Sequence, residues 1–297
     1  MNKKLFWFVP CAMIGIGAGM LITGLILGAK PVVKAGYDEM GKNGEITSGT
    51  VALKDFDSLE VNVASVNTYI EEGDEYKLEY KAYEKNVPVV KEKGGKLTVE
   101  QPASKVFFGI NLSFIREEED QYYKITVPKN AGEINLDFDA ASGKIAVSDV
   151  NVKGKIELAS GKAELNNINS KELILRASSG RMDLNKVELS KLDVEVLSGK
   201  LVSENCVTDE LVADMSSGSM DFDKIKFNKG DFKVSSGSLK VNVLGKEDDY
   251  SYDVEASSGS IKIGDKKVGD EYRIEKSGDK EIKADVSSGS IKFSFGE

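Results

Sequence analysis

The most constraining feature of this sequence is a Ser-Gly dipeptide that occurs eight times between residues 142 and 289 in phase with the same apolar pattern. The first six glycines are separated by 18, 19, 19, 19 and 19 residues, and two more follow after 22 and 30. A fixed period of this length is typical of proteins built from stacked structural repeats, and a flexible linker would not keep it. The eight copies are Ser142-Gly143, Ser160-Gly161, Ser179-Gly180, Ser198-Gly199, Ser217-Gly218, Ser236-Gly237, Ser258-Gly259 and Ser288-Gly289.

Apolar residues keep the same phase as the dipeptide. Ala, Leu, Val or Met stands three residues before each glycine, and Ile, Ala, Met or Leu stands two residues after it. Polar residues fill the positions between them, which is the period-two alternation of β-strands. We therefore predict an all-β fold, a β-solenoid like a parallel β-helix. Its coils of about nineteen residues would each complete the core of the next.

The order of the coils is expected to follow the chain. Ser287-Ser288-Gly289 would then be the last turn of the stack, and the insertion 263–286 would fold back over that end. An open last coil would otherwise leave a strand edge that invites association.

The repeated dipeptide is interpreted as a structural corner. The serine hydroxyl would point inward and bond to the next coil, and glycine would supply the backbone angles of the turn. A serine nucleophile needs an adjacent base, and eight equivalent copies are unlike an active site. A phosphate-binding loop would need a following helix, which no periodicity here indicates.

The residue after the first four glycines is a cation, namely Lys144, Lys162, Arg181 or Lys200. This line of charge would suit a polyanion such as an acidic cell-wall polymer. The alternative is a solvated face whose cations are balanced by acids such as Glu164. Both interpretations stay open at this point.

Composition excludes several classes of function. Forty Lys and Arg residues face 49 Asp and Glu residues, a net charge of −9, which argues against nucleic acid as a partner. The chain has no histidine, the commonest general base and metal ligand, so we expect no metal, no cofactor and no enzymatic activity. Of the two cysteines, Cys206 falls in a column of buried apolar residues and is expected to be buried and unreactive.

The N-terminus predicts a membrane anchor. Residues 5–29 carry no charge over 25 positions, long enough to cross the ~30 Å hydrocarbon core. A cleaved signal peptide is the alternative, but its apolar region is normally shorter. Residues 1–4 would form a short cytoplasmic tail, and the chain after the helix would lie outside the cytoplasm as a single-pass membrane protein. The pairs Gly15/Gly19 and Gly24/Gly28 have the spacing that permits helix-mediated self-association.

The remaining chain divides into three parts. Residues 30–50 are polar and read as a linker, residues 51–133 as N-terminal β coils with a cap, and residues 134–297 as the Ser-Gly solenoid. The segment 105–115 is dense in apolar residues and is expected to cap the solenoid or to contact a partner or membrane. Its contact residues would be Phe107, Phe108, Ile110, Leu112 and Phe114.

The chain resembles a family of bacterial envelope proteins described as putative adhesins with β-strand repeats, a domain of unknown function. The matching stretches are "FDSLEVNVASVNTYIEEGDEYKLEY" (Phe56–Tyr80), "YKITVPKN" (Tyr123–Asn130) and the "SSG" series, so the likeness covers about residues 50–297. It implies the solenoid fold and, often, a single membrane helix. It supplies no catalytic or ligand-binding residues.

These features predict a membrane-anchored, extracytoplasmic domain that binds or scaffolds in the cell envelope, with an envelope polymer or a membrane protein as partner. One alternative is a regulator that senses envelope state and acts on a membrane partner. A polysaccharide-acting enzyme is another, for which the acid pairs Asp137/Asp139 and Asp221/Asp223 would be candidates. A filament formed by end-to-end stacking is a further possibility.

Overall fold

The computed structural model describes residues 45–102 and 120–296. These belong to one compact unit, Glu45–Glu297. The described chain is almost entirely β, with 3-10 turns at η1 (Glu84–Asn86) and η2 (Glu247–Asp249). It contains no helix long and apolar enough to span a membrane. The predicted membrane helix, residues 5–29, lies outside the described residues.

A typical coil places one strand in each of two stacked layers. The strand β10 (Val152–Leu158) lies in the first layer and ends at the Ser160-Gly161 corner. The chain then enters the second layer as the first half of β11 (Lys162–Ala177), whose second half returns to the first layer. β10 pairs in parallel with β8 (Ile134–Ala140), Val152 opposite Ile134, so equivalent positions of successive coils lie side by side.

A second corner returns the chain to the first layer. It is made by a residue six positions after the glycine whose φ lies between 52° and 60°, in the left-handed region. Asparagine and aspartate tolerate this conformation better than most residues, and they fill three of the five positions. The five residues are Asp149, Asn167, Lys186, Asn205 and Lys224. We call this side of the stack the left-handed edge and the opposite side the Ser-Gly edge.

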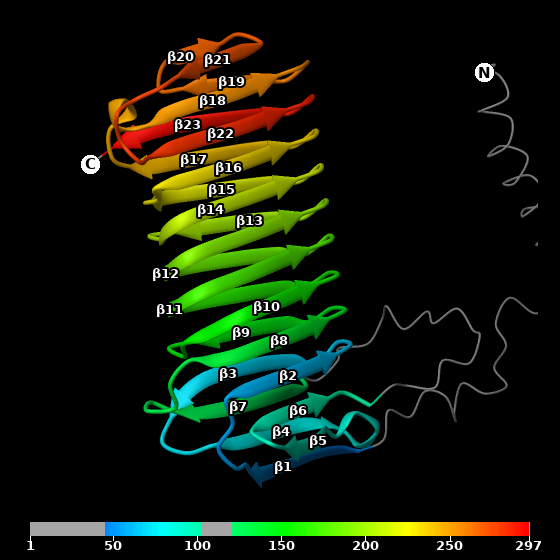
Figure 1. Ribbon diagram of the computed structural model, residues 1–297. Helices are drawn as coiled ribbons and strands as arrows, with labels where there is room; N and C mark the ends of the chain where they lie inside the picture. Colours follow the sequence, from blue (N-terminus) through cyan, green and yellow to red (C-terminus); the bar gives the residue numbers. More distant parts are fainter. Residues whose placement is uncertain (1–44, 103–119, 297) are drawn as a thin grey trace, which may run out of the picture. The chain divides into compact units, whose positions relative to one another are not determined.

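The layers extend over the full stack in Figure 1. The strands β11 and β12 (Arg181–Val196) run through both layers. In spatial order, the first layer contains β5 (Val89–Lys93), β6 (Lys96–Glu100), β2 (Ser58–Val63), β8, β10, β11, β12, β14 (Val207–Met215), β16 (Lys229–Val234), β22 (Glu281–Val286), β18 (Ser251–Ala256) and β21 (Glu271–Ile274). The second contains β1 (Ile46–Ala52), β4 (Lys77–Tyr83), β7 (Tyr122–Pro128), β3 (Asn67–Gly73), β9 (Lys144–Ser148), β11, β12, β13 (Lys200–Glu204), β15 (Ser219–Ile225), β17 (Ser238–Leu244), β23 (Ser290–Gly296), β19 (Ser260–Ile263) and β20 (Lys266–Val268).

Both ends of the stack depart from chain order. β22 and β23 form the last coil in sequence, yet they lie between β16–β17 and β18–β19. At the other end, β2 and β3 lie between β6–β7 and β8–β9. The expectation that Ser287-Ser288-Gly289 is the last turn is therefore wrong. The 263–286 insertion is long enough to build two antiparallel strands, β20 and β21, before the chain turns back into the stack.

Antiparallel strands close each end. β20 and β21 cover β19 and β18, and β5, β4 and β1 do the same beyond β6 and β7. β1 begins at Ile46, inside the range 30–50 that its polar sequence "ITSGT" suggested as linker. Hydrogen bonding to β4, rather than burial of an alternating apolar face, makes this stretch a strand.

One continuous core lies between the layers. In the middle coils it is lined by aliphatic and small residues, whereas near β16, β17 and β23 it becomes aromatic. Phe227, Phe232, Tyr250 and Phe293 are buried there, with ring centroids 5.2 to 5.8 Å apart. Cys206 is buried as its column predicted, and burial raises the pKa of its thiol.

Candidate functional site

The Ser-Gly edge is held by backbone stacking. The Lys162 amide donates to the Gly143 carbonyl at 2.9 Å, and the Ser160 amide donates to the Ala141 carbonyl at 2.9 Å. The same two bonds recur in later coils. A Cβ atom on Gly218 would lie 2.1 Å from the Gly199 carbonyl oxygen. Glycine is needed here because the neighbouring backbone is too close for any side chain.

This reason differs from the one the sequence suggested. Among the eight repeat glycines, only Gly143 and Gly161 have a positive φ, at 92° and 90°. In the other six copies an ordinary backbone conformation meets a close neighbour. Glycine is thus required at these positions mainly by the close packing of neighbouring coils, and less by the turn of the chain.

The serine hydroxyls do not form the expected inward ladder. Ser142 is half-buried and the other seven serines are exposed. Within the described coils, two of these hydroxyls donate to a carbonyl of the neighbouring coil, Ser142 to Ala64 at 3.0 Å and Ser160 to Ala141 at 3.1 Å. The expectation was wrong because the chain bends after the last inward residue, so strand parity does not continue through the corner.

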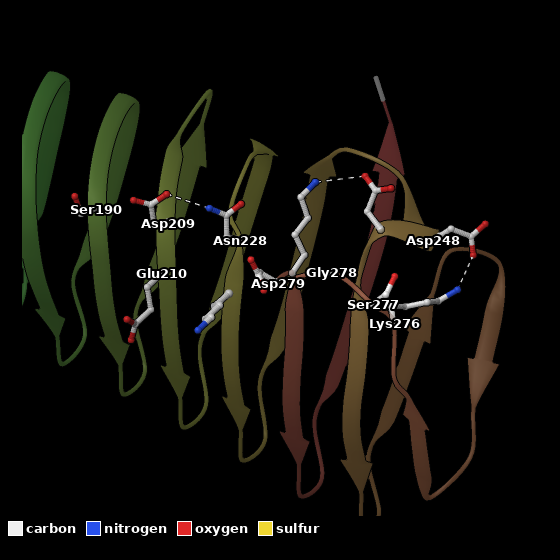
Figure 2. A pocket seen from close by; sticks show the side chains of 12 residues that line it. Ser190, Asp209, Glu210, Asn228, Asp248, Lys276, Ser277, Gly278 and Asp279 are labelled. Carbon is white, nitrogen blue, oxygen red and sulfur yellow. Dashed lines mark hydrogen bonds and ion pairs between the residues drawn. The ribbon is translucent and has the colours of Figure 1, made fainter.

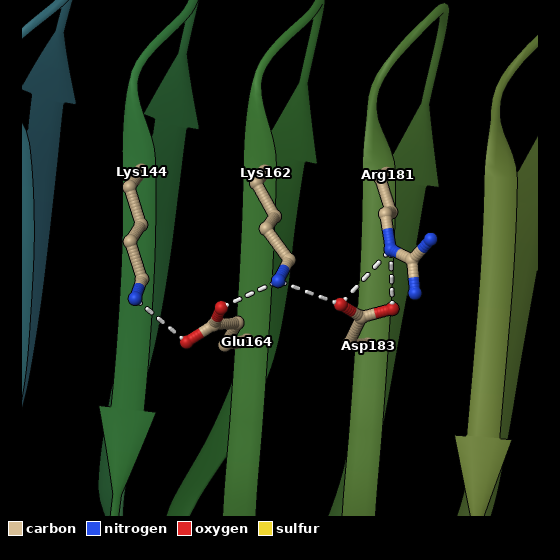
Figure 3. Close-up of polar contacts among 5 residues, drawn as sticks. All are labelled: Lys144, Lys162, Glu164, Arg181 and Asp183. Carbon is tan, nitrogen blue, oxygen red and sulfur yellow. Dashed lines mark hydrogen bonds and ion pairs between the residues drawn. The ribbon is translucent and has the colours of Figure 1, made fainter.

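The cation line that follows the glycines is neutralised along most of its length. Lys144 and Lys162 contact opposite oxygens of Glu164 at 2.8 and 2.6 Å, and Lys162 also contacts Asp183 at 2.9 Å. Arg181 then contacts Asp183 at 2.7 Å. Figure 3 shows the resulting chain of alternating charges across three coils. This arrangement favours the solvated-face interpretation over a polyanion track at these residues.

The outward face of the second layer carries a different row farther along the stack. Lys240 on β17 lies opposite Lys292 on β23, which lies opposite Lys262 on β19, which lies opposite Lys267 on β20. We call these four residues the lysine row. Lys262 reaches Asp265 at 3.8 Å, but that carboxylate is fully exposed. Lys240, Lys267 and Lys292 form no ion pair within 4.0 Å among the residues that the structure describes.

Sequence reasoning missed the lysine row, although a signal for most of it was present. The position three residues after the glycine is Glu164, Asp183 and Asp221 in three of the earlier copies, and Lys240, Lys262 and Lys292 in the last three. Lys267 gave no such signal, because only the β19–β20 hairpin brings it opposite Lys262.

A shallow groove lies beside the left-handed edge (Figure 2). Its volume is about 850 Å³, and it is open to solvent. Its charged groups are largely paired: Lys276 contacts Asp248 at 3.3 Å, Lys280 contacts Asp249 at 3.3 Å, and Asn228 donates to Asp209 at 3.1 Å. The groove is lined by Ser190, Asp209, Glu210, Asn228, Lys229, Asp248, Asp249, Lys276, Ser277, Gly278, Asp279 and Lys280.

The acid pairs proposed for an enzyme lie on different layers. Asp137 and Asp139 are on β8 in the first layer, and Asp221 and Asp223 are on β15 in the second. Burial and the neighbouring Glu157 carboxyl raise the pKa of Asp139. Asp223 accepts a hydrogen bond from Asn242 at 2.8 Å. The structure does not bring the two pairs together.

Asp214 on β14 is a half-buried acid of the first layer. One of its carboxylate oxygens is buried without a hydrogen-bond partner. Burial is the main reason that the pKa of this carboxyl is raised, and nearby Asp231, Asp193 and Glu195 add to it against the opposing effect of Lys233. Within the described ranges, no group of three potential ligands is arranged to hold a metal ion.

The predicted contact residues Phe107, Phe108, Ile110, Leu112 and Phe114 lie outside the described residues. The segment that contains them connects β6 to β7. Gln101, just before it, accepts hydrogen bonds from the backbone amides of Ala64, Ser65 and Val66 at 2.8 to 3.3 Å. This side chain fixes the corner between β2 and β3, which has no glycine.

The fold recurs in solved structures of low sequence identity. A putative adhesin from Parabacteroides distasonis is 16% identical, with a TM-score of 0.54, and the match covers 84% of this chain and 97% of that one. A putative lipid binding protein from the same species is 21% identical, with a TM-score of 0.52 and the same coverage. At this identity the likeness shows the fold alone. No curated protein matches the chain.

A family model covers most of the β unit. The model described as Toastrack DUF4097 matches residues 56–294, from just before β2 into β23, the second strand of the coil inserted near the far end. The matched range includes the two-layered coils and both corners. The chain therefore belongs to the Toastrack DUF4097 family.

Proposed function

We propose that this chain is a non-enzymatic, adhesin-like binding module of the bacterial cell envelope. Residues 5–29 would hold it in the membrane as a single-pass protein, with the β unit outside the cytoplasm. The observation that carries the proposal is the construction of the unit. Two hydrogen-bonded layers fix long rows of outward side chains in register, which suits an extended binding surface better than an enclosed active site.

The descriptions of two solved structures with this fold support the same role. One is described as a putative adhesin and the other as a putative lipid binding protein. Both names denote binding. The pairing of charges in the groove and along the Lys144–Arg181 line further favours a solvated surface over a catalytic centre there.

The test combines topology with retention. Intact cells expressing the full chain with a C-terminal epitope would be treated with protease, and isolated envelopes would then be washed with salt and with detergent. The proposal expects loss of the epitope in intact cells and release by detergent but not by salt. Epitope protection in intact cells that becomes accessible only after lysis would refute the extracytoplasmic placement. Salt release would refute the membrane anchor.

A further inference from the structure

The lysine row places four like charges beside one another on a flat sheet. Adjacent strands are about 4.8 Å apart, so the row extends over roughly 14 Å. Like charges directly opposite in neighbouring strands are destabilising. Elsewhere on the same layer Lys144, Lys162 and Arg181 also lie opposite one another, but Glu164 and Asp183 form ion pairs between them. At the β15 end of the lysine row Asp221 lies opposite Lys240, but the two form no ion pair within 4.0 Å. The lysine row thus departs from the pattern of the earlier coils because acids do not bridge its cations.

Hydroxyl and amide groups border the row on both sides. Ser238, Ser290 and Ser260 lie in register two residues before the lysines, and Asn242 and Ser294 lie two residues after two of them. All five are half-buried on the outward face. The surface therefore offers a line of cations flanked by hydrogen-bond groups that repeat with the same spacing.

From this geometry we propose that the lysine row binds a linear polymer that carries phosphate or carboxylate groups at regular intervals. The strands β17, β23, β19 and β20 lie side by side (Figure 1). The ammonium groups of their four lysines would each meet an anion of the polymer, and the serine hydroxyls would contact its backbone. A linear ligand matches a linear row because each repeat gains the same contact. This inference rests on the proposed binding function and names the chemistry of its ligand.

A lipid surface fits the row less well. Membrane-docking surfaces combine basic residues with exposed apolar side chains that enter the interface. In the described part of the chain, the exposed large hydrophobic residues are Val89, Leu197 and Val207, and none lies on the strands of the lysine row. The net charge of the chain is −9, so the protein as a whole repels anions. The lysine row is basic, so it attracts an anion locally.

The test compares two variants that lose the same charge from the same layer. The first is the triple variant Lys240→Gln, Lys262→Gln and Lys292→Gln. The matched control replaces the paired cations Lys144, Lys162 and Arg181 by Gln. Full-length protein in nonionic detergent would be titrated with fluorescently labelled linear polyphosphate and with polygalacturonate, at several salt concentrations. Circular dichroism melting would show that both variants are folded.

The expected result is that wild-type protein binds at least one polymer. The first variant should bind it at least about tenfold more weakly with a smaller salt dependence, and the control should change by less than about threefold. Binding of polyphosphate alone identifies a phosphodiester ligand, and binding of polygalacturonate alone identifies a carboxylate ligand. Equal weakening in both variants, or no binding of either polymer, overturns the inference. Phosphatidylglycerol in mixed micelles with the same detergent is titrated in parallel, and row-dependent binding to it alone overturns the inference in favour of a membrane surface.

Envelope retention separates this inference from the broader proposal. Wild-type protein that is extracytoplasmic and membrane-anchored, yet binds neither polymer, would leave the envelope function standing and remove the lysine row as its site. If the chain binds the polymer but protease cannot reach it in intact cells, the lysine row stands as a binding site and the extracytoplasmic placement is refuted.

Discussion

Replacing Gly218 by alanine tests the central explanation of the repeat. The added Cβ would lie 2.1 Å from the Gly199 carbonyl oxygen, and real Cβ atoms do not approach closer than 3.0 Å. The two coils must therefore separate locally by at least about 0.9 Å. The bonds that hold them at this corner run from the Ser217 amide to Leu197 at 2.8 Å and from the Ser219 amide to Gly199 at 3.1 Å. A separation of this size breaks both.

The expected destabilisation follows from these losses. Two hydrogen bonds contribute about 1 kcal/mol each, and overpacking costs about 1–3 kcal/mol. Alanine restricts the unfolded chain and returns roughly 0.4–1 kcal/mol. The net loss in free energy of unfolding is about 2–5 kcal/mol. It would be measured by urea unfolding, monitored by circular dichroism and by tyrosine fluorescence.

Gly269→Ala is the matched control, because a Cβ at Gly269 meets nothing within 4 Å and its φ is not in the left-handed region. This variant should lie within about 0.5 kcal/mol of wild type or be slightly more stable. The stacking explanation is refuted if Gly218→Ala is as stable as Gly269→Ala. In that case glycine at the corner would reflect only the ease of bending.

Three further predictions concern buried polar groups. Asp214→Asn should stabilise the protein at neutral pH by less than about 1 kcal/mol after allowance for solvent screening. Because the pKa of Asp214 is raised in the folded state, that gain should disappear in urea titrations as the pH falls below 4, where the unfolded acid is also neutral. Tyr250→Phe should cost about 1–3 kcal/mol in denaturation, since the hydroxyl donates to the buried Phe227 carbonyl at 2.7 Å. Burial raises the pKa of Tyr250 to about 12, so wild-type stability that is present below pH 10 should fall toward pH 12, and a phenolate absorbance step at pH 10 that is lost in Tyr250→Phe would contradict this. Cys206 should react with a thiol reagent in a Cys11→Ser background only after unfolding, and rapid labelling of the native protein would disprove its burial.

The sequence predicted the coil well because stacking imposes a strict pattern on few positions. Each inward residue must fill the same space as its counterparts above and below, so Val150, Ile168 and Val187 recur in phase and place Cys206 among them. The close contact between Gly199 and Gly218 requires glycine at the same position of each coil. Because the same packing requirements recur in every coil, the pattern can be recognised in a single sequence.

The features that sequence reasoning missed occur where the repetition stops or where the side chains are free to vary. Chain order suggested that the Gly289 corner follows the Gly259 corner, whereas backbone bonds place it between Gly237 and Gly259. Nothing in the apolar pattern distinguishes the two arrangements, because every coil has equivalent inward residues. The second corner was missed for another reason: its positive φ is filled by Asp149, Asn167 and Lys186 without a common residue type.

The insertion of β22 and β23 between two coils that precede them in the sequence affects how the unit folds. A stack assembled from one end could grow coil by coil as the chain emerges, each new layer using the last as its template. Here the edges of β16 and β17 must stay unpaired while β18 to β21 are made, and they are covered only when the following segment arrives. Once in place, β22 and β23 are hydrogen-bonded on both sides, so neither can peel away from an exposed edge. A force applied to β23 must therefore break two strand pairings at once, whereas a force on an edge strand breaks one.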